Sequence, residues 1–175
     1  GRYWILVKLT TDTGLVGWGE CYAASVSPKA MAHVIADVFG RHMQNEHPEN
    51  IEKMFRRVYS SGFTQRPDLT VMGAFSGLEI ACWDILGKHR NRPVWALLGG
   101  KMNDRIRAYT YLYPLPHHDP VAFWTSPEMA AESATDCVQR GYTAVKFDPA
   151  GPYTLRGGHM PAQSDITLSV AFCKA

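Results

Sequence analysis

The longest hydrophobic pattern in the 175-residue chain runs over residues 71–100. Apolar residues recur there at helical spacing along one stripe, and others extend onto neighbouring faces, so we expect a helix that is covered on most sides. Glycines and alanines interrupt the pattern, which a helix tolerates where another backbone packs close. The pattern predicts a central helix that ends near residues 91–93, then a short helix over 94–98. The stripe comprises Val71, Phe75, Leu78, Cys82 and Ile85.

A different pattern precedes this helix. Residues 3–10 and 15–20 are rich in β-branched and aromatic side chains, and the turn residues between them predict a β-hairpin. Gly17 and Gly19 would let another backbone approach this hairpin, or would mark bulges. Two amphipathic helices should follow. The first begins at Ser27-Pro28 and runs to about residue 43, and the second covers about 49–59.

After residue 100 the pattern becomes strand, helix, strand, helix. The strands are expected at 105–113 and 142–148, the helices at 126–140 and from 165 onward. This alternation is typical of a parallel β/α unit, and two strands cannot bury such a sheet. We therefore expect two domains, residues 1–102 and 103–175, the second being the start of a larger protein's β/α domain.

Composition narrows the classes of function. The formal charge of +2, with no block of Lys and Arg among aromatic residues, argues against a nucleic-acid partner. No run of 18 or more apolar residues predicts a membrane span. The four cysteines lie far apart without a CxxC pair, which predicts reduced thiols and a cytoplasmic protein. The chain has no initiator Met, so we expect it to begin within a longer sequence.

Lys146 and Asp148 are the most informative pair of charged residues. Residues i and i+2 of a strand share a face, so both side chains would project toward the mouth of a barrel at the carboxyl end of the strand. A salt-bridged strand end without chemistry is the alternative. Tyr111 and Tyr113 end the preceding strand and either line the same mouth or serve as packing residues.

The sequence His117-His118-Asp119 is a candidate metal site by residue type alone. Side chains of adjacent residues are expected to diverge, and no further cluster supports a ligand set. We therefore expect an exposed loop at this point. The Gly99-Gly100-Lys101 sequence does not meet the phosphate-loop spacing, and Ser76 does not meet the spacing of a nucleophile elbow.

Three segments together resemble a known family: GLVGWGE at 14–20, SGLEIACWDILGK at 76–88 with RPVWALLGG at 92–100, and GYTAVKFD at 141–148. They resemble the enolase superfamily in its mandelate racemase/muconate lactonizing enzyme group, and are most like acid-sugar dehydratases of the galactonate dehydratase type. The resemblance covers nearly the whole chain. It implies an α+β capping domain followed by the start of a modified (β/α)7β TIM-like barrel.

The resemblance also implies a chemistry. Such enzymes remove a proton next to a carboxylate and stabilise the enediolate with Mg²⁺, whose three carboxylate ligands would lie beyond this chain, as would the His base. Racemases of the group carry Lys-x-Lys where this chain has Lys146 and Asp148. The missing second Lys favours dehydration to a 2-keto-3-deoxy acid, with Lys146 contacting the substrate carboxylate or the leaving group.

Two loops match the specificity loops of the family. Tyr22 in the first, and Phe63 and Arg66 in the second, are therefore candidate substrate contacts, together with Tyr113. The implied partner is a small-molecule carboxylate, a sugar acid, and we expect a homo-oligomer. A racemase, epimerase or cycloisomerase of the same superfamily remains an alternative, as does a non-catalytic fragment.

Overall fold

The computed structural model describes residues 3–22, 26–64, 66–147 and 163–175, with side chains from Ile166 onward in the last range. It divides into two compact units, unit 1 (residues 1–102) and unit 2 (residues 103–175). Asp148, one of the predicted site residues, lies outside the described residues.

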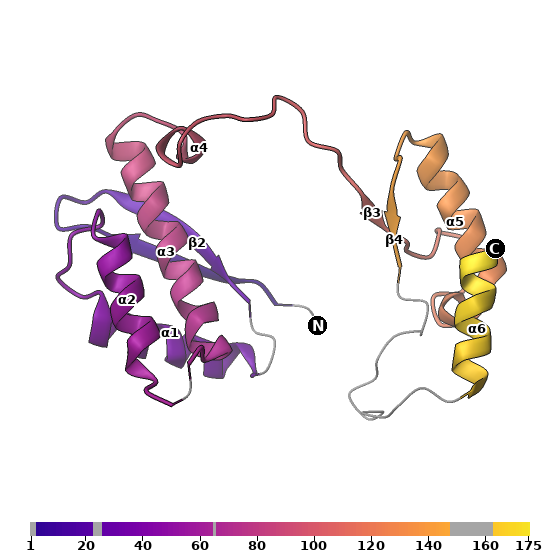
Figure 1. Ribbon diagram of the computed structural model, residues 1–175, viewed down its shortest axis with the longest axis horizontal. Helices are drawn as coiled ribbons and strands as arrows, with labels where there is room; N and C mark the ends of the chain where they lie inside the picture. Colours follow the sequence, from indigo (N-terminus) through magenta and orange to yellow (C-terminus); the bar gives the residue numbers. More distant parts are fainter. Residues whose placement is uncertain (1–2, 23–25, 65, 148–162) are drawn as a thin grey trace. The chain divides into compact units, whose positions relative to one another are not determined.

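Unit 1 is a two-stranded antiparallel hairpin with helices packed on one face (Figure 1). The hairpin pairs Ile5 with Cys21 at one end and Thr10 with Val16 at the other. The long helix α3 lies against β2, and α1 and α2 pack on α3 in turn. The elements are β1 (Ile5–Thr10), β2 (Val16–Cys21), α1 (Pro28–His42), α2 (Ile51–Ser61), α3 (Leu69–His89) and α4 (Val94–Leu97).

Glycine brings α3 directly onto the hairpin, which is the first of the two roles that the sequence left open for Gly17 and Gly19. A Cβ added at Gly19 would stand 1.9 Å from the Gly77 carbonyl oxygen, and one at Gly17 would stand 2.1 Å from the Ala81 carbonyl oxygen. Real Cβ atoms do not approach so closely, so only glycine fits at these two positions. The close approach buries the middle of α3, where Phe75 and Leu78 are each 1% exposed.

Asp68 is the N-cap of helix α3, and its side chain accepts hydrogen bonds from the Thr70 and Val71 backbone N–H groups. By length and composition it is the one helix, among the residues searched, that could cross a membrane. A core helix passes the same test, and α3 carries nine buried residues within unit 1. Its packing against the hairpin is that of a core helix.

Unit 2 is a parallel strand pair with helices beside it (Figure 1). The pair places Tyr111 opposite Lys146, and the Leu112 N–H donates to the Lys146 carbonyl at 2.8 Å. Buried Leu112, Phe123 and Cys137 form a small core on the side of α5. The elements are β3 (Thr110–Tyr111), the 3-10 helix η1 (Ala122–Thr125), α5 (Pro127–Gln139), β4 (Val145–Lys146) and α6 (Gln163–Lys174).

The strands of unit 2 are shorter than predicted. Residues 105–113 and 142–148 read as strands, but only two residues of each make the described ladder. Parallel strands are extended and covered within larger sheets, and β3 and β4 pair only with each other among the described residues. The helix starts were predicted well, because Ser126 caps α5 through its hydroxyl, which accepts from the Met129 N–H.

Candidate functional site

The carboxyl end of the β3–β4 pair gathers a lysine and two tyrosines on one face. The Lys146 Nζ lies 5.8 Å from the centroid of the Tyr111 ring, and the Tyr111 and Tyr113 rings lie 5.4 Å apart. Val145 and Phe147 pack instead against the core on the α5 side, as strand alternation requires. Lys146 is therefore exposed on the face that α5 does not cover.

Tyr113 is fixed by its backbone and open at its ring. The Ser133 hydroxyl of α5 donates a hydrogen bond to the Tyr113 carbonyl at 3.0 Å, and Ser133 itself is 1% exposed. The Tyr113 residue is 53% exposed. A buried anchor and an exposed phenol suit a side chain that meets a ligand, so Tyr113 stays a predicted substrate contact.

The other predicted contacts belong to unit 1 and flank the beginning of α3. Tyr22 directly follows β2, and a Cβ added at Gly73 of α3 would stand 3.6 Å from the Tyr22 carbonyl oxygen. Phe63 and Arg66 lie between α2 and α3, just before the Asp68 cap. Tyr22 is 79% exposed, Phe63 is 80% exposed, and Arg66 is exposed too. The two loops thus meet the same helix end with their side chains accessible.

A cavity among the described residues of unit 1 lies away from these contacts. It has a volume of about 650 Å³ and is lined by the hairpin turn around Asp12 and by the carboxyl end of α3 around Leu86. Tyr22, at the other end of the hairpin, does not line it, nor do Phe63 and Arg66. The predicted contacts of unit 1 therefore lie on accessible loops, outside this cavity.

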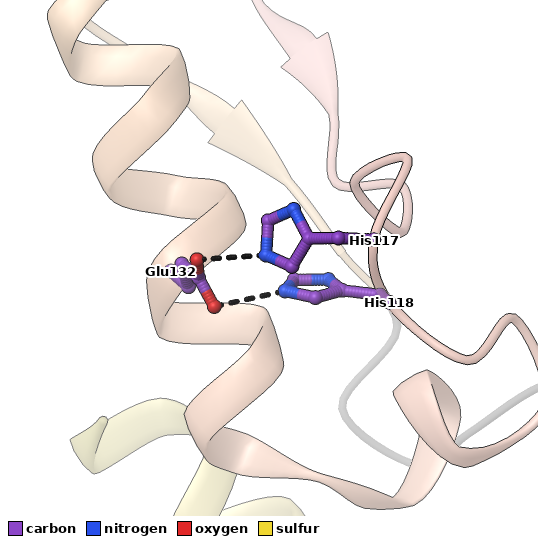
Figure 2. Close-up of side chains that lie close together, drawn as sticks. All are labelled: His117, His118 and Glu132. Atoms are coloured by element: carbon purple, nitrogen blue, oxygen red, sulfur yellow. Dashed lines mark hydrogen bonds and ion pairs between the residues drawn. The ribbon is translucent and has the colours of Figure 1, made fainter.

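In unit 2, two histidines converge on one carboxylate (Figure 2). The Nε2 atoms of His117 and His118 lie 3.0 Å and 2.9 Å from the two carboxylate oxygens of Glu132 on α5, and the two rings are 4.5 Å apart. The prediction that the two side chains diverge is wrong. The prediction of an exposed loop is wrong for His118, whose side chain is 3% exposed, although His117 is 63% exposed.

The donor atoms of this cluster lie within 4.8 Å of one another, close enough to hold a metal ion. The Leu115 N–H, however, donates to His118 Nδ1 at 3.1 Å, so the neutral ring carries its proton on Nε2, the atom that faces Glu132. A histidine that ligates metal through Nε2 instead donates from Nδ1 to an acceptor. The hydrogen bonds favour a brace between loop and helix.

Mg²⁺ in particular does not fit the cluster of His117, His118 and Glu132. Mg²⁺ takes oxygen ligands, whereas two of the three donors here are imidazole nitrogens. Among the residues searched, no other group of three potential ligands comes together. The residues that the structure describes therefore do not fit the Mg²⁺ ion that the family resemblance implies.

The Glu132 carboxylate suits the brace electrostatically. Hydrogen bonds from His118 and then from His117 lower the pKa of the Glu132 carboxyl below its ordinary value, so it stays ionised. Sequence reasoning missed Glu132 and Ser133 because they lie 14 and 20 residues from their loop partners His118 and Tyr113. The one available signal was the Ser126-Pro127 helix start, which places both residues in the second turn of α5.

Comparison with known proteins identifies the family. Residues 2–99 match the N-terminal domain of the mandelate racemase / muconate lactonizing enzyme family. A solved mandelate racemase/muconate lactonizing enzyme from Sulfitobacter sp. is 83% identical with a TM-score of 0.91, over 99% of this chain and 44% of that one. The similarity thus extends through unit 2 as well as unit 1.

Two curated relatives are dehydratases by name. D-galactonate dehydratase from Klebsiella pneumoniae (strain 342) is 36% identical over 62% of this chain. D-gluconate/D-galactonate dehydratase from Picrophilus torridus is 33% identical over 83% of this chain. The chain spans only 28% and 35% of the length of these two relatives. It belongs to the mandelate racemase / muconate lactonizing enzyme family of the enolase superfamily, of which it carries the capping domain and the start of the barrel.

Proposed function

We propose that this chain is the N-terminal part of an acid-sugar dehydratase that converts an aldonate or aldarate to a 2-keto-3-deoxy acid. The observation that carries the proposal is the position of Lys146, a cation at the carboxyl end of β4 on the face that α5 leaves open. Barrel enzymes of this type work at the carboxyl ends of their strands. The dehydratase relatives support the reaction class.

The reaction removes the elements of water. A base takes the proton from the carbon next to the carboxylate, the hydroxyl on the following carbon leaves as water, and the resulting enol takes up a proton to become the ketone. Negative charge develops on the carboxylate oxygens during the first step. A positioned cation that faces this charge lowers the barrier, and we assign this role to Lys146.

The remaining predicted contacts would recognise the substrate. The Tyr113 phenol can donate a hydrogen bond to a carboxylate or hydroxyl oxygen, and the Arg66 guanidinium can bind a carboxylate in bidentate fashion. Exposed Tyr22 and Phe63 would cover the carbon chain. The base and the ligands of Mg²⁺ are expected on barrel strands that the relatives carry beyond this chain.

The residue two places after Lys146 favours dehydration over racemisation. Two-base racemisation needs a second base on this strand, and position 148 is Asp instead of Lys. A carboxylate there can act on a leaving group or orient Lys146. We therefore favour dehydration over the racemase, epimerase and cycloisomerase reactions of the superfamily.

The test is Lys146→Ala in the full-length enzyme, with Lys174→Ala as the matched control. Lys174 is an exposed lysine at the end of α6 in the same unit. Loss of the cation should cost about 3 kcal/mol in the barrier, roughly a hundredfold in turnover, with little change in the melting temperature. If Lys146 instead braces the strand end, its loss should lower the melting temperature and change turnover little. Near-normal turnover with a large fall in melting temperature would overturn the catalytic role.

A further inference from the structure

We propose that Glu132 and Ser133 of α5 are positioning residues for Tyr113, holding its loop through two anchors so that its ring packs against Tyr111, the ring over which Lys146 lies. The inference rests on the proposed function, because it takes Tyr113 as a substrate contact. It goes beyond that function by assigning a task to the polar side chains that join α5 to the loop after β3.

The first anchor fixes the start of the loop. The Ser133 hydroxyl donates to the Tyr113 carbonyl at 3.0 Å from within the core of unit 2. Loss of this buried hydroxyl would leave the Tyr113 carbonyl without that hydrogen-bond partner. The bond sets the backbone at Tyr113 and leaves the ring to pack against Tyr111.

The second anchor fixes the turn that follows. The His118 N–H donates to the Leu115 carbonyl at 2.9 Å, and the Leu115 N–H donates to the His118 imidazole at 3.1 Å. This doubly closed turn is tied to α5 by the bond from His118 Nε2–H to Glu132 at 2.9 Å. A hydrogen bond to a charged acceptor is about twice as strong as one between neutral groups.

The segment between the anchors is stiff. Pro114 and Pro116 have fixed φ angles, so few backbone torsions remain between Tyr113 and His118. A shift at the second anchor is therefore carried back to the tyrosine instead of being absorbed along the loop. His117 shares the Glu132 carboxylate but is exposed, so the buried His118 ring is the one that ties the turn to α5.

The experiment replaces the anchor and measures both the loop and the substrate. Glu132→Ala removes the acceptor, whereas Glu132→Gln keeps an amide oxygen that can accept from His118 Nε2–H. Asp136→Ala is the matched control, because Asp136 is a carboxylate one turn further along α5 that pairs with Arg140. Each variant is made in the full-length enzyme, alone and combined with Tyr113→Phe.

In Glu132→Ala we expect the Leu115 amide to exchange with solvent at least about tenfold faster, because the turn opens locally. The KM for the sugar acid should rise about tenfold while kcat changes less, and Tyr113→Phe should remove most of this difference. Glu132→Gln should restore most of both readouts. Asp136→Ala should change neither.

Unchanged exchange at Leu115 in Glu132→Ala would overturn the proposal, as would a KM shift of equal size in the Tyr113→Phe background. If Glu132→Ala does not fold, His118→Asn replaces it, because Asn retains an acceptor for the Leu115 N–H but does not reach Glu132. If the unmodified enzyme dehydrates no sugar acid, the proposed function fails, and the exchange measurement alone decides whether α5 holds the loop.

Discussion

The two units position their predicted contacts by different physical means. In unit 1 Tyr22 follows a strand whose backbone packs closely on α3, with glycine at the crossing, and Arg66 precedes the Asp68 cap of that helix. In unit 2 the loop that carries Tyr113 depends on side-chain hydrogen bonds from Ser133 and Glu132. The packing in unit 1 should be sensitive to an increase in side-chain volume. The loop in unit 2 should be sensitive to the loss of single hydrogen-bonding atoms.

The cores differ accordingly. Among the described residues, the buried cluster of unit 1 extends from the hairpin through all three long helices, whereas that of unit 2 consists of Leu112, Phe123 and Cys137. A small core contributes little burial free energy, so polar contacts carry a larger share of the order in unit 2. Substitutions can therefore test the two units separately.

The largest effect is expected in the core of unit 1. Phe75 is 1% exposed, and Phe75→Ala should lower the free energy of unfolding by about 4 kcal/mol through lost burial and a cavity. Phe63→Ala is the control, since Phe63 is 80% exposed and its loss should cost no more than about 0.5 kcal/mol. Urea titration of both variants checks the ranking. Equal losses would mean that Phe75 is not a core residue.

A smaller but more specific loss is expected at the helix–hairpin crossing. Gly19→Ala places a methyl group 1.9 Å from a backbone oxygen, which must move the strand or the helix at a cost of about 3 kcal/mol. Gly40→Ala in α1 meets nothing within 4 Å and should instead gain up to about 1 kcal/mol from helix propensity. Unfolding curves with the same sign for both variants would contradict the packing described.

The smallest effect concerns pH and unit 1 alone. Burial, followed by the Arg41 charge, lowers the pKa of His42 below 6.5, and its Nε2 lacks a hydrogen-bond partner among the described groups. The unfolded chain then binds more protons than the folded one, so stability is complete above pH 6.5 and falls as the pH drops toward the folded pKa. His42→Leu should flatten the melting temperature between pH 7 and pH 5. If the melting temperature of the variant still falls by the same amount between pH 7 and pH 5, His42 is not the source of the pH dependence.

Local signals in the sequence predicted much of this fold. Ser27-Pro28 and Ser126-Pro127 mark the starts of α1 and α5, because an N-cap and a first-turn proline act over a few residues. Strand alternation likewise predicted that Lys146 is turned away from Val145 and Phe147. The roles assigned to these residues stay predictions.

Features that depend on distant partners were not predictable in the same way. The lengths of β3 and β4 depend on pairing with neighbouring strands, and local strand propensity carries no information about that pairing. The meeting of His118 with Glu132 depends on how the loop after β3 folds back onto α5. The sequence predicted that the side chains of the two adjacent histidines diverge. The turn at Leu115 directs both rings toward α5, and no local pattern in the sequence indicates this turn.

Proton NMR of the full-length enzyme with a panel of sugar acids in D₂O tests the central claim most directly. Dehydration predicts a 2-keto-3-deoxy product with one deuterium at C3, formed with loss of water, and recovered substrate without a new stereoisomer. Lys146→Ala should slow this conversion about a hundredfold. Deuterium at C2 of a recovered epimer, with no keto product from any sugar acid, would contradict the account and assign the chain to a racemase instead.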